Sequence, residues 1–124
     1  MKAFPSLIAI FLLTVSAENC GKKTTSNSYK GRLEIAGICM NYTIGLLEGA
    51  IDSSLIAASW TDETNGKTYN NVFRLGSPCN FPASIKQGDE FYFVIDSTTA
   101  QNCAVCQAYY PAPSKSLRIK VVQK

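Results

Sequence analysis

From residue 29 onward the sequence carries no long helical period, and this restricts the chain to a fold built from strands. Apolar residues there recur at every second position over short stretches, as in Leu117, Ile119 and Val121. Such alternation is typical of strands that bury one face. Because 124 residues leave room for one domain, we predict a single β domain over residues 29–124.

The predicted strands lie between clusters of turn-forming residues. We expect strands at 30–49, 55–62, 67–75, 88–96, 104–110 and 115–123. The first is long and bent at Gly37, and Asn65-Gly66 closes a hairpin between the second and third, since both residues tolerate a positive φ. This number of strands predicts a small disulfide-stabilised β-barrel of the oligonucleotide/oligosaccharide-binding type (OB-like), with a β-sandwich as the alternative.

The first 17 residues have the pattern of a secretory signal peptide. Lys2 provides a positive start, and residues 7–15 form an uncharged apolar stretch. Ala17 is a small residue that suits cleavage before Glu18. The apolar stretch is too short to span a bilayer, which takes about 20 residues. We therefore predict an exported protein, either secreted or held in the periplasm or at the outer membrane.

A second candidate cleavage site stands before Cys20, where a lipoprotein would carry its lipid. Glu18 and Asn19 are poor residues ahead of such a cysteine, but residues 21–28 are polar throughout, as in a tether. We therefore predict a flexible tail over residues 18–28. Two alternatives stay open, a soluble secreted domain and a domain attached to a membrane through lipid on Cys20.

Four of the five cysteines lie in the predicted domain, at Cys39, Cys79, Cys103 and Cys106. An exported chain meets an oxidising compartment, so we predict two structural disulfides. Four cysteines allow three pairings. Cys39 with Cys106 and Cys79 with Cys103 are favoured, because the first two are expected in strands and the other two in loops.

The spacing of Cys103 and Cys106 also matches the C-x-x-C of redox and zinc proteins. A redox centre of this kind usually starts a helix in an α/β setting, whereas a loop and a strand are predicted here. Zinc would need two more ligands, which Cys39 and Cys79 would have to supply. We predict no metal and no cofactor, and keep a redox or metal-binding protein as an alternative.

The chain contains no histidine. This excludes Ser-His-Asp and Cys-His catalysis and histidine general bases. The neighbours Asp62-Glu63 and Asp89-Glu90 would point to opposite faces of a strand, so we predict solvated turn charges rather than a catalytic dyad. No catalytic residue is predicted, and the chain is not expected to be an enzyme.

The charge of the chain argues against nucleic-acid binding. Without Lys2, 11 of the 12 Lys and Arg residues remain against 9 Asp and Glu, which leaves a net charge of +2. These residues form no basic stripe along the sequence, so an electrostatic footprint for nucleic acid is missing.

Aromatic residues gather in the predicted strands. Phe91, Phe93 and Ile95 share one strand face and are predicted in the core. Other rings would either cover the barrel or form an exposed patch for a sugar or peptide. The candidate patch consists of Trp60, Tyr92, Tyr109 and Tyr110.

Four segments together resemble a group of small uncharacterised exported proteins and lipoproteins of Bacteroidota-type bacteria. They are YKGRLEIAGICMNYTI (29–44), ASWTDETNGKTYNNVF (58–73), IKQGDEFYFVID (85–96) and NCAVCQAYYPAPSKSLRIKVV (102–122). The resemblance implies export and lipid attachment in a bacterial envelope, although Asn19 departs from the usual lipoprotein signal.

Three classes of function are left. The favoured one is a non-enzymatic envelope or secreted module that binds a protein or carbohydrate. The second is a redox or metal-binding protein that uses Cys103 and Cys106. The third is an inhibitor or structural protein whose disulfide-held loops fill a site on another protein.

Overall fold

The computed structural model describes residues 28–97 and 103–123. Two short 3-10 turns, η1 and η2, interrupt a series of strands. The elements are β1 (Tyr29–Ala36), η1 (Ile38–Met40), β2 (Tyr42–Glu48), β3 (Ala57–Thr61), β4 (Thr68–Leu75), η2 (Pro78–Asn80), β5 (Glu90–Ile95), β6 (Ser116–Leu117) and β7 (Ile119–Val122). The predicted signal peptide, most of the predicted tail and Cys20 lie outside the described residues.

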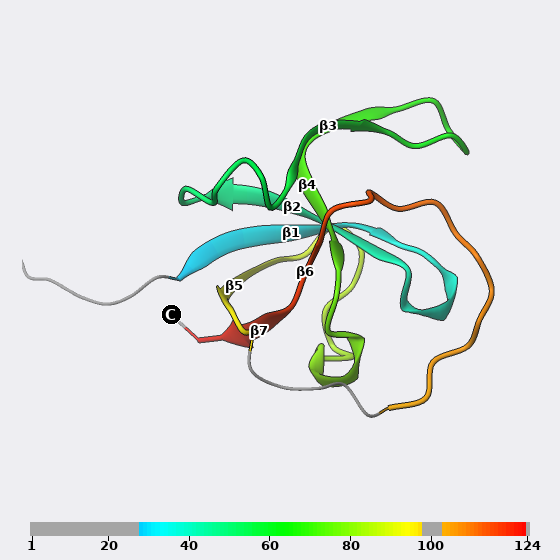
Figure 1. The fold of residues 1–124 in the computed structure, drawn as a ribbon. Coiled ribbons are helices and arrows are strands. Elements are labelled where there is room, and N and C mark those ends of the chain that lie inside the picture. The colour runs from blue at the N-terminus through cyan, green and yellow to red at the C-terminus, as the bar shows by residue number, and fades with distance from the viewer. Residues whose placement is uncertain (1–27, 98–102, 124) are drawn as a thin grey trace, which may run out of the picture.

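The strands form one curled sheet in the order β3-β4-β2-β1-β5-β7 (Figure 1). Neighbours along this path are antiparallel, whereas β6 pairs with β4 in parallel. The prediction of an all-β domain is confirmed. The predicted barrel is not shown to close, since β6 contributes only two residues and is offset from β7 by Arg118. The pairing therefore also allows the sandwich alternative.

The first predicted strand is in fact two strands. A bulge at Glu34 bends β1, where the register with β2 shifts between Leu33 and Ile35. Cys39 and Met40 then adopt φ angles of 59° and 60°, the left-handed region that reverses the chain. Cys39 consequently lies in the turn between β1 and β2, not within a strand.

The predicted hairpin is present, and its tip differs from the expectation. Gly66 has a φ of 73°, as the turn requires, but Asp62 is not a solvated charge. Its side chain is 1% exposed, and its Oδ1 accepts hydrogen bonds from the backbone N–H of Thr64 at 2.8 Å and from the Thr64 hydroxyl at 2.7 Å. The carboxylate therefore holds the turn together.

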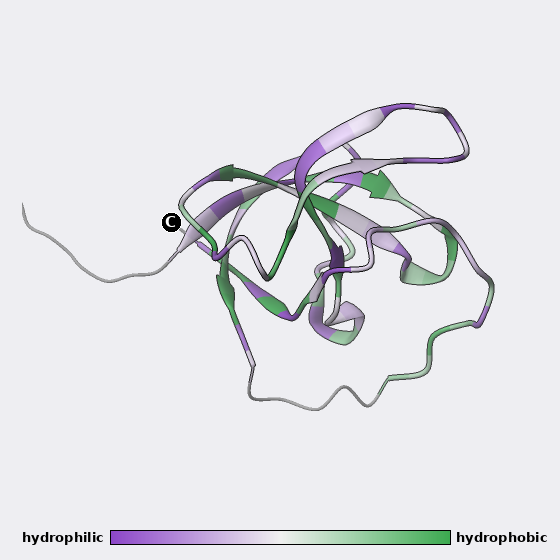
Figure 2. Ribbon diagram, turned by 45° about the horizontal axis from the view of Figure 1, so that its top comes forward, coloured by the Kyte–Doolittle hydropathy of each residue, from purple (hydrophilic) through white to green (hydrophobic). Residues whose placement is uncertain are grey.

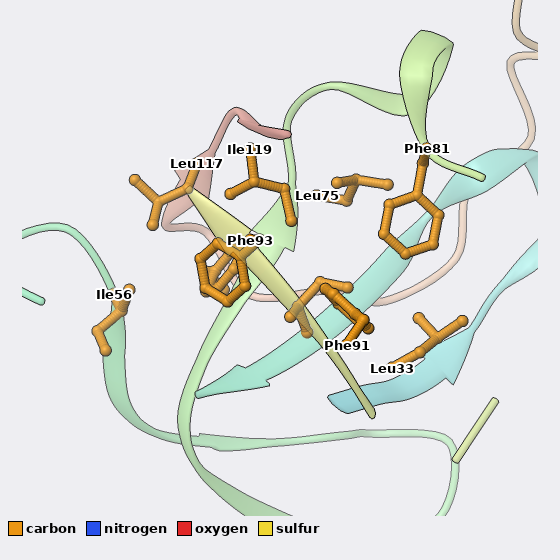
Figure 3. Packing of buried hydrophobic residues seen from close by; sticks show 10 residues of the cluster. Leu33, Ile56, Leu75, Phe81, Phe91, Phe93, Leu117 and Ile119 are labelled. Carbon is orange, nitrogen blue, oxygen red and sulfur yellow. The ribbon is translucent and has the colours of Figure 1, made fainter. Parts of the chain in front are cut away.

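The core lies inside the curl of the sheet (Figure 3), and hydrophobic residues stand among hydrophilic ones along its strands (Figure 2). Phe93 is fully buried at its centre, as predicted, and Phe91 is 7% exposed. The prediction for Ile95 is wrong, because this residue is 37% exposed at the end of β5. The buried cluster comprises Leu33, Ile44, Ile56, Phe73, Leu75, Phe81, Phe91, Phe93, Leu117 and Ile119.

A buried hydroxyl joins the end of β4 to the C-terminal strands. Ser77 is 1% exposed. Its Oγ donates to the carbonyl of Ile119 at 2.8 Å and accepts from the N–H of the same residue at 2.9 Å. The N–H of Gly76 also donates to the carbonyl of Leu117 at 2.7 Å. These bonds position the loop that follows β4, which carries η2.

The segment 104–110 is not a strand, contrary to the prediction. It runs as an irregular loop around one side of the domain (Figure 1). Side chains and disulfides hold it instead of a strand ladder, and the buried Pro111 and Pro113 follow it. Within the part of the chain that the structure describes, no helix has the length and apolar character needed to span a membrane.

Candidate functional site

Two disulfides tie the 103–110 loop to the two 3-10 turns. Cys39 of η1 pairs with Cys106, with their Cα atoms 5.1 Å apart, and Cys79 of η2 pairs with Cys103, with their Cα atoms 5.4 Å apart. These are the two pairs that the sequence favoured. We call residues 38–41, 74–80 and 103–110 together the disulfide end.

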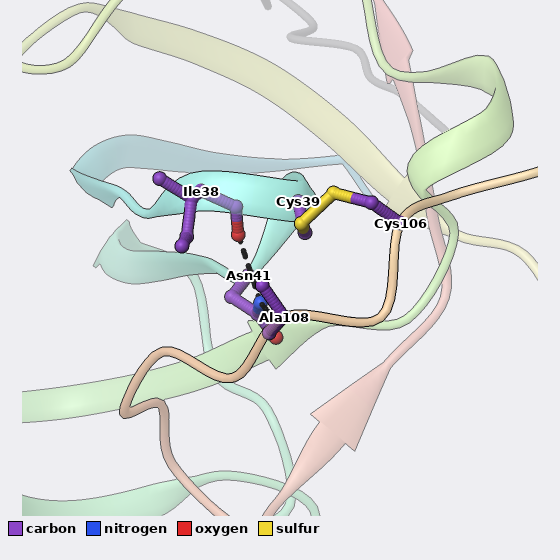
Figure 4. Close-up of a disulfide and its surroundings, with 5 residues drawn as sticks. All are labelled: Ile38, Cys39, Asn41, Cys106 and Ala108. Carbon is purple, nitrogen blue, oxygen red and sulfur yellow. Dashed lines mark hydrogen bonds between the residues drawn. A yellow bond between two sulfur atoms is a disulfide. The ribbon is translucent and has the colours of Figure 1, made fainter.

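Asn41 adds a third attachment between the turn and the loop (Figure 4). Its side-chain Nδ2 donates to the carbonyl of Ile38 at 2.8 Å and to the carbonyl of Ala108 at 3.0 Å. Both amide hydrogens are therefore used, one within η1 and one across to the loop. The loop is thus fixed at Cys103, Cys106 and Ala108, although no strand pairs with it.

The fixed loop borders an open hollow of about 340 Å³. This volume is at the lower end of the range for small-molecule sites, about 300–1,000 Å³. Met40, Leu75, Pro78 and Val105 contribute apolar wall, and the disulfide Cys39–Cys106 forms part of the rim. Tyr109 stands beside the hollow with 71% of its surface exposed.

Arg74 carries the only charge among the described residues that line this hollow. Its Nε is buried and has no hydrogen-bond partner, and no carboxylate of the described residues forms an ion pair with it. A buried donor that lacks an acceptor costs about 1–3 kcal/mol. Arg74 is one of three described residues with a buried side-chain atom that lacks a hydrogen-bond partner, the others being Thr43 and Asp62.

The residue paired with Arg74 on β2 also has a buried polar side-chain atom without a hydrogen-bond partner. Thr43 is the cross-strand partner of Arg74, is fully buried, and its Oγ1 has no hydrogen-bond partner among the described residues. Directly paired residues place their side chains on the same side of a sheet. Ile44 and Phe73, the next pair along, belong to the core, so Thr43 and Arg74 face away from the core.

Two other hollows offer fewer groups that could bind a ligand. One of about 480 Å³, beside Phe91 and Tyr92, is lined by no charged residue among those described. The other, of about 360 Å³, contains Asp96 and Arg118, and both of these already interact within the protein. Neither presents an unpaired buried donor.

The main cluster of charges, on β1 and its neighbours, is internally neutralised. Glu90 lies 3.1 Å from Lys30 and 3.2 Å from Arg32. The hydrogen bond from Lys30 holds the pKa of Glu90 below its ordinary value, and the same bond raises the pKa of Lys30. These groups are at least partly exposed and satisfy one another, so they do not indicate a ligand site.

The four residues of the candidate aromatic patch do not come together. Trp60 of β3 packs on Tyr69, with ring centroids 5.9 Å apart. Tyr92 lies on β5, and β4, β2 and β1 separate it from β3 in the sheet. Tyr110 packs against Gly37, so Tyr109 alone borders the hollow beside Arg74.

The C-x-x-C pair is divided between two disulfides. Cys103 and Cys106 bond to Cys79 and Cys39 and not to each other. Among residues 28–97 and 103–123, no three His, Cys, Asp or Glu side chains gather as a metal site. Disulfides of this kind are typical of proteins outside the cytoplasm.

The comparisons with known proteins give no relative. No protein-family model, curated protein or solved structure matches the chain. The site therefore has to be interpreted from its own geometry. Sequence reasoning missed Arg74, whose only signal was an arginine between Phe73 and Leu75 in an otherwise apolar strand end.

Gly37 is expected to be intolerant of any side chain. A Cβ there would lie 2.6 Å from the carbonyl oxygen of Asn41 and 2.6 Å from the ring of Tyr110. Gly37→Ala should therefore lower the free energy of unfolding by about 1–3 kcal/mol, the usual cost of overpacking. Urea unfolding measures this change. In a Tyr110→Ala background the added cost should shrink, and an equal cost in both backgrounds would contradict the contact.

Proposed function

We propose that the chain is an exported, non-enzymatic binding module of the cell envelope or the secreted fraction. Its disulfide end binds the ligand or partner. The observation that supports this proposal is a hollow that Arg74 lines beside a loop fixed by two disulfides, together with the buried Nε of Arg74, which has no hydrogen-bond partner.

The rigidity of the 103–110 loop supports a binding function rather than a redox function. A loop already ordered in the free protein does not pay its ordering entropy on binding. A redox C-x-x-C forms its disulfide within the motif, whereas here each cysteine cross-links a different turn. The exposed, fixed loop would equally suit insertion of Val105 and Tyr109 into a partner, the inhibitory alternative.

A fragment screen followed by ¹H–¹⁵N NMR tests the location of binding without assuming a ligand. We expect shifts from weakly binding fragments to concentrate at residues 38–41, 74–80 and 103–110. Shifts that concentrate beside Tyr92, or that scatter over the sheet, would contradict the proposal. Alkylation of Cys103 and Cys106 without prior reduction would instead favour the redox alternative.

The route of export is tested by the intact mass of the protein from its native host. A mature chain that begins at Glu18 would be a soluble secreted domain. A chain that begins at Cys20 and carries acyl groups would be a lipoprotein. A mass that retains residues 1–17 would contradict export through a cleaved signal peptide.

A further inference from the structure

We infer that the hollow beside Arg74 is a carboxylate site, which takes a monocarboxylic acid on a compact apolar body. This inference rests on the proposed function, because it names the ligand class of the same site.

The charge of the hollow fits one negative group. Arg74 is the single charged residue among the described residues of its lining, and its Nε–H points to no acceptor in the protein. A guanidinium presents parallel N–H groups that match the two oxygens of a carboxylate. A phosphate dianion would leave its second charge without a cation, so a carboxylate is the better match.

The walls of the hollow fit an apolar body beside that carboxylate. Met40, Leu75, Pro78 and Val105 line the same hollow as Arg74, and the exposed ring of Tyr109 can cover an apolar group while its hydroxyl stays in water. Gln107 and Asn41 add polar side chains to the same lining, so hydrogen-bond partners stand beside the apolar wall.

The size of the hollow suits a compact ligand body. A volume of about 340 Å³ is small for a ligand site. Two sources supply this chemistry, a free small acid and the C-terminal residue of a peptide chain. Both place a carboxylate next to a single apolar group.

The test compares an acid with its own amide by ¹H–¹⁵N NMR titration of the purified protein. The probes are N-acetyl-phenylalanine and N-acetyl-phenylalanine amide, which differ in charge and share the apolar body. We expect the acid to bind at residues 38–41, 74–80 and 103–110 with a dissociation constant at least about 10-fold lower than that of the amide, the scale of one charged hydrogen-bonded pair. Equal affinities would overturn the carboxylate assignment but leave binding at this site intact.

Variants assign the preference to Arg74. Arg74→Gln should remove the difference between acid and amide, and Arg74→Lys should retain part of it, because lysine keeps the charge without the planar pair of donors. Arg32→Gln is the matched control, since it removes the same charge from the ion-pair cluster on β1. If Arg32→Gln weakened acid binding as much as Arg74→Gln, net charge would explain the result and the inference would fail.

Two further probes complete the test. If N-acetyl-Gly-Gly-Phe binds more tightly than N-acetyl-phenylalanine, the source of the carboxylate is the C-terminal residue of a peptide chain. Equal binding of the two probes would identify a free small acid. Inorganic phosphate should not compete at matched ionic strength. Competition by phosphate as strong as that by the acid would overturn the inference in favour of unselective anion binding.

Discussion

Removal of the Cys39–Cys106 disulfide, by alanine at both positions, is expected to lower the free energy of unfolding by about 4 kcal/mol. This bond joins residues 67 apart in sequence, so its loss frees a long loop in the unfolded chain. It also releases η1 from the 103–110 loop. Urea unfolding in a Cys20→Ser background, where the fifth cysteine cannot form new pairs, measures the change.

The second disulfide provides the matched comparison. Cys79 and Cys103 are only 24 residues apart, and the same chain-entropy relation predicts a smaller loss, about 3 kcal/mol. The order of the two effects is the informative result. A larger loss from the Cys79–Cys103 pair, or a loss below about 1 kcal/mol from the Cys39–Cys106 pair, would contradict the account of how the loop is held.

The truncation Phe93→Ala is expected to lower the free energy of unfolding by a similar amount, about 3–5 kcal/mol. The ring is fully buried and its centroid lies 5.5 Å from that of Tyr29, 5.8 Å from that of Phe73 and 6.0 Å from that of Phe91. The backbone at Gly31 is shaped around it, since a Cβ there would lie 2.9 Å from the ring. Alanine would leave a cavity that these neighbours cannot fill.

Two variants make the Phe93 result interpretable. Val94→Ala, at the adjacent half-buried position on the other face of β5, should cost clearly less. Phe93→Leu keeps most of the volume and should cost about 1.5 kcal/mol or less, so it reports on the site if Phe93→Ala fails to fold. A Val94→Ala loss equal to that of Phe93→Ala would show that the core does not lie on the Phe93 face.

The fold class and the hairpin could be predicted because they depend on local pattern. Alternation placed Phe93, Leu117 and Ile119 in the core, and Gly66 marked the hairpin tip. Ile95 continued the same alternation but stands at the strand end, where the sheet no longer covers it. Periodicity indicates which face of the sheet a residue occupies. It does not indicate how far along the strand that face is buried by other parts of the chain.

The disulfide pairs were predicted correctly for a reason that is partly wrong. Neither Cys39 nor Cys106 lies in a strand, and the pair forms because left-handed residues at 39 and 40 turn the chain towards the loop. The role of Arg74 could not be predicted, because the hollow that it lines is completed by residues 105–109, which follow it by 31 to 35 positions in the sequence. Such a property belongs to the assembled fold and leaves no local pattern.

The most direct test of the account is the NMR signal of the Arg74 side-chain Nε–H group. Its assignment follows from its absence in Arg74→Lys. We predict that saturating N-acetyl-phenylalanine moves this signal downfield as the guanidinium gains a charged acceptor, while the amide analogue leaves it near its free position. A signal that stays fixed at saturation with the acid would mean that Arg74 does not hold the carboxylate, and would contradict the central claim that its unpaired guanidinium forms the binding site.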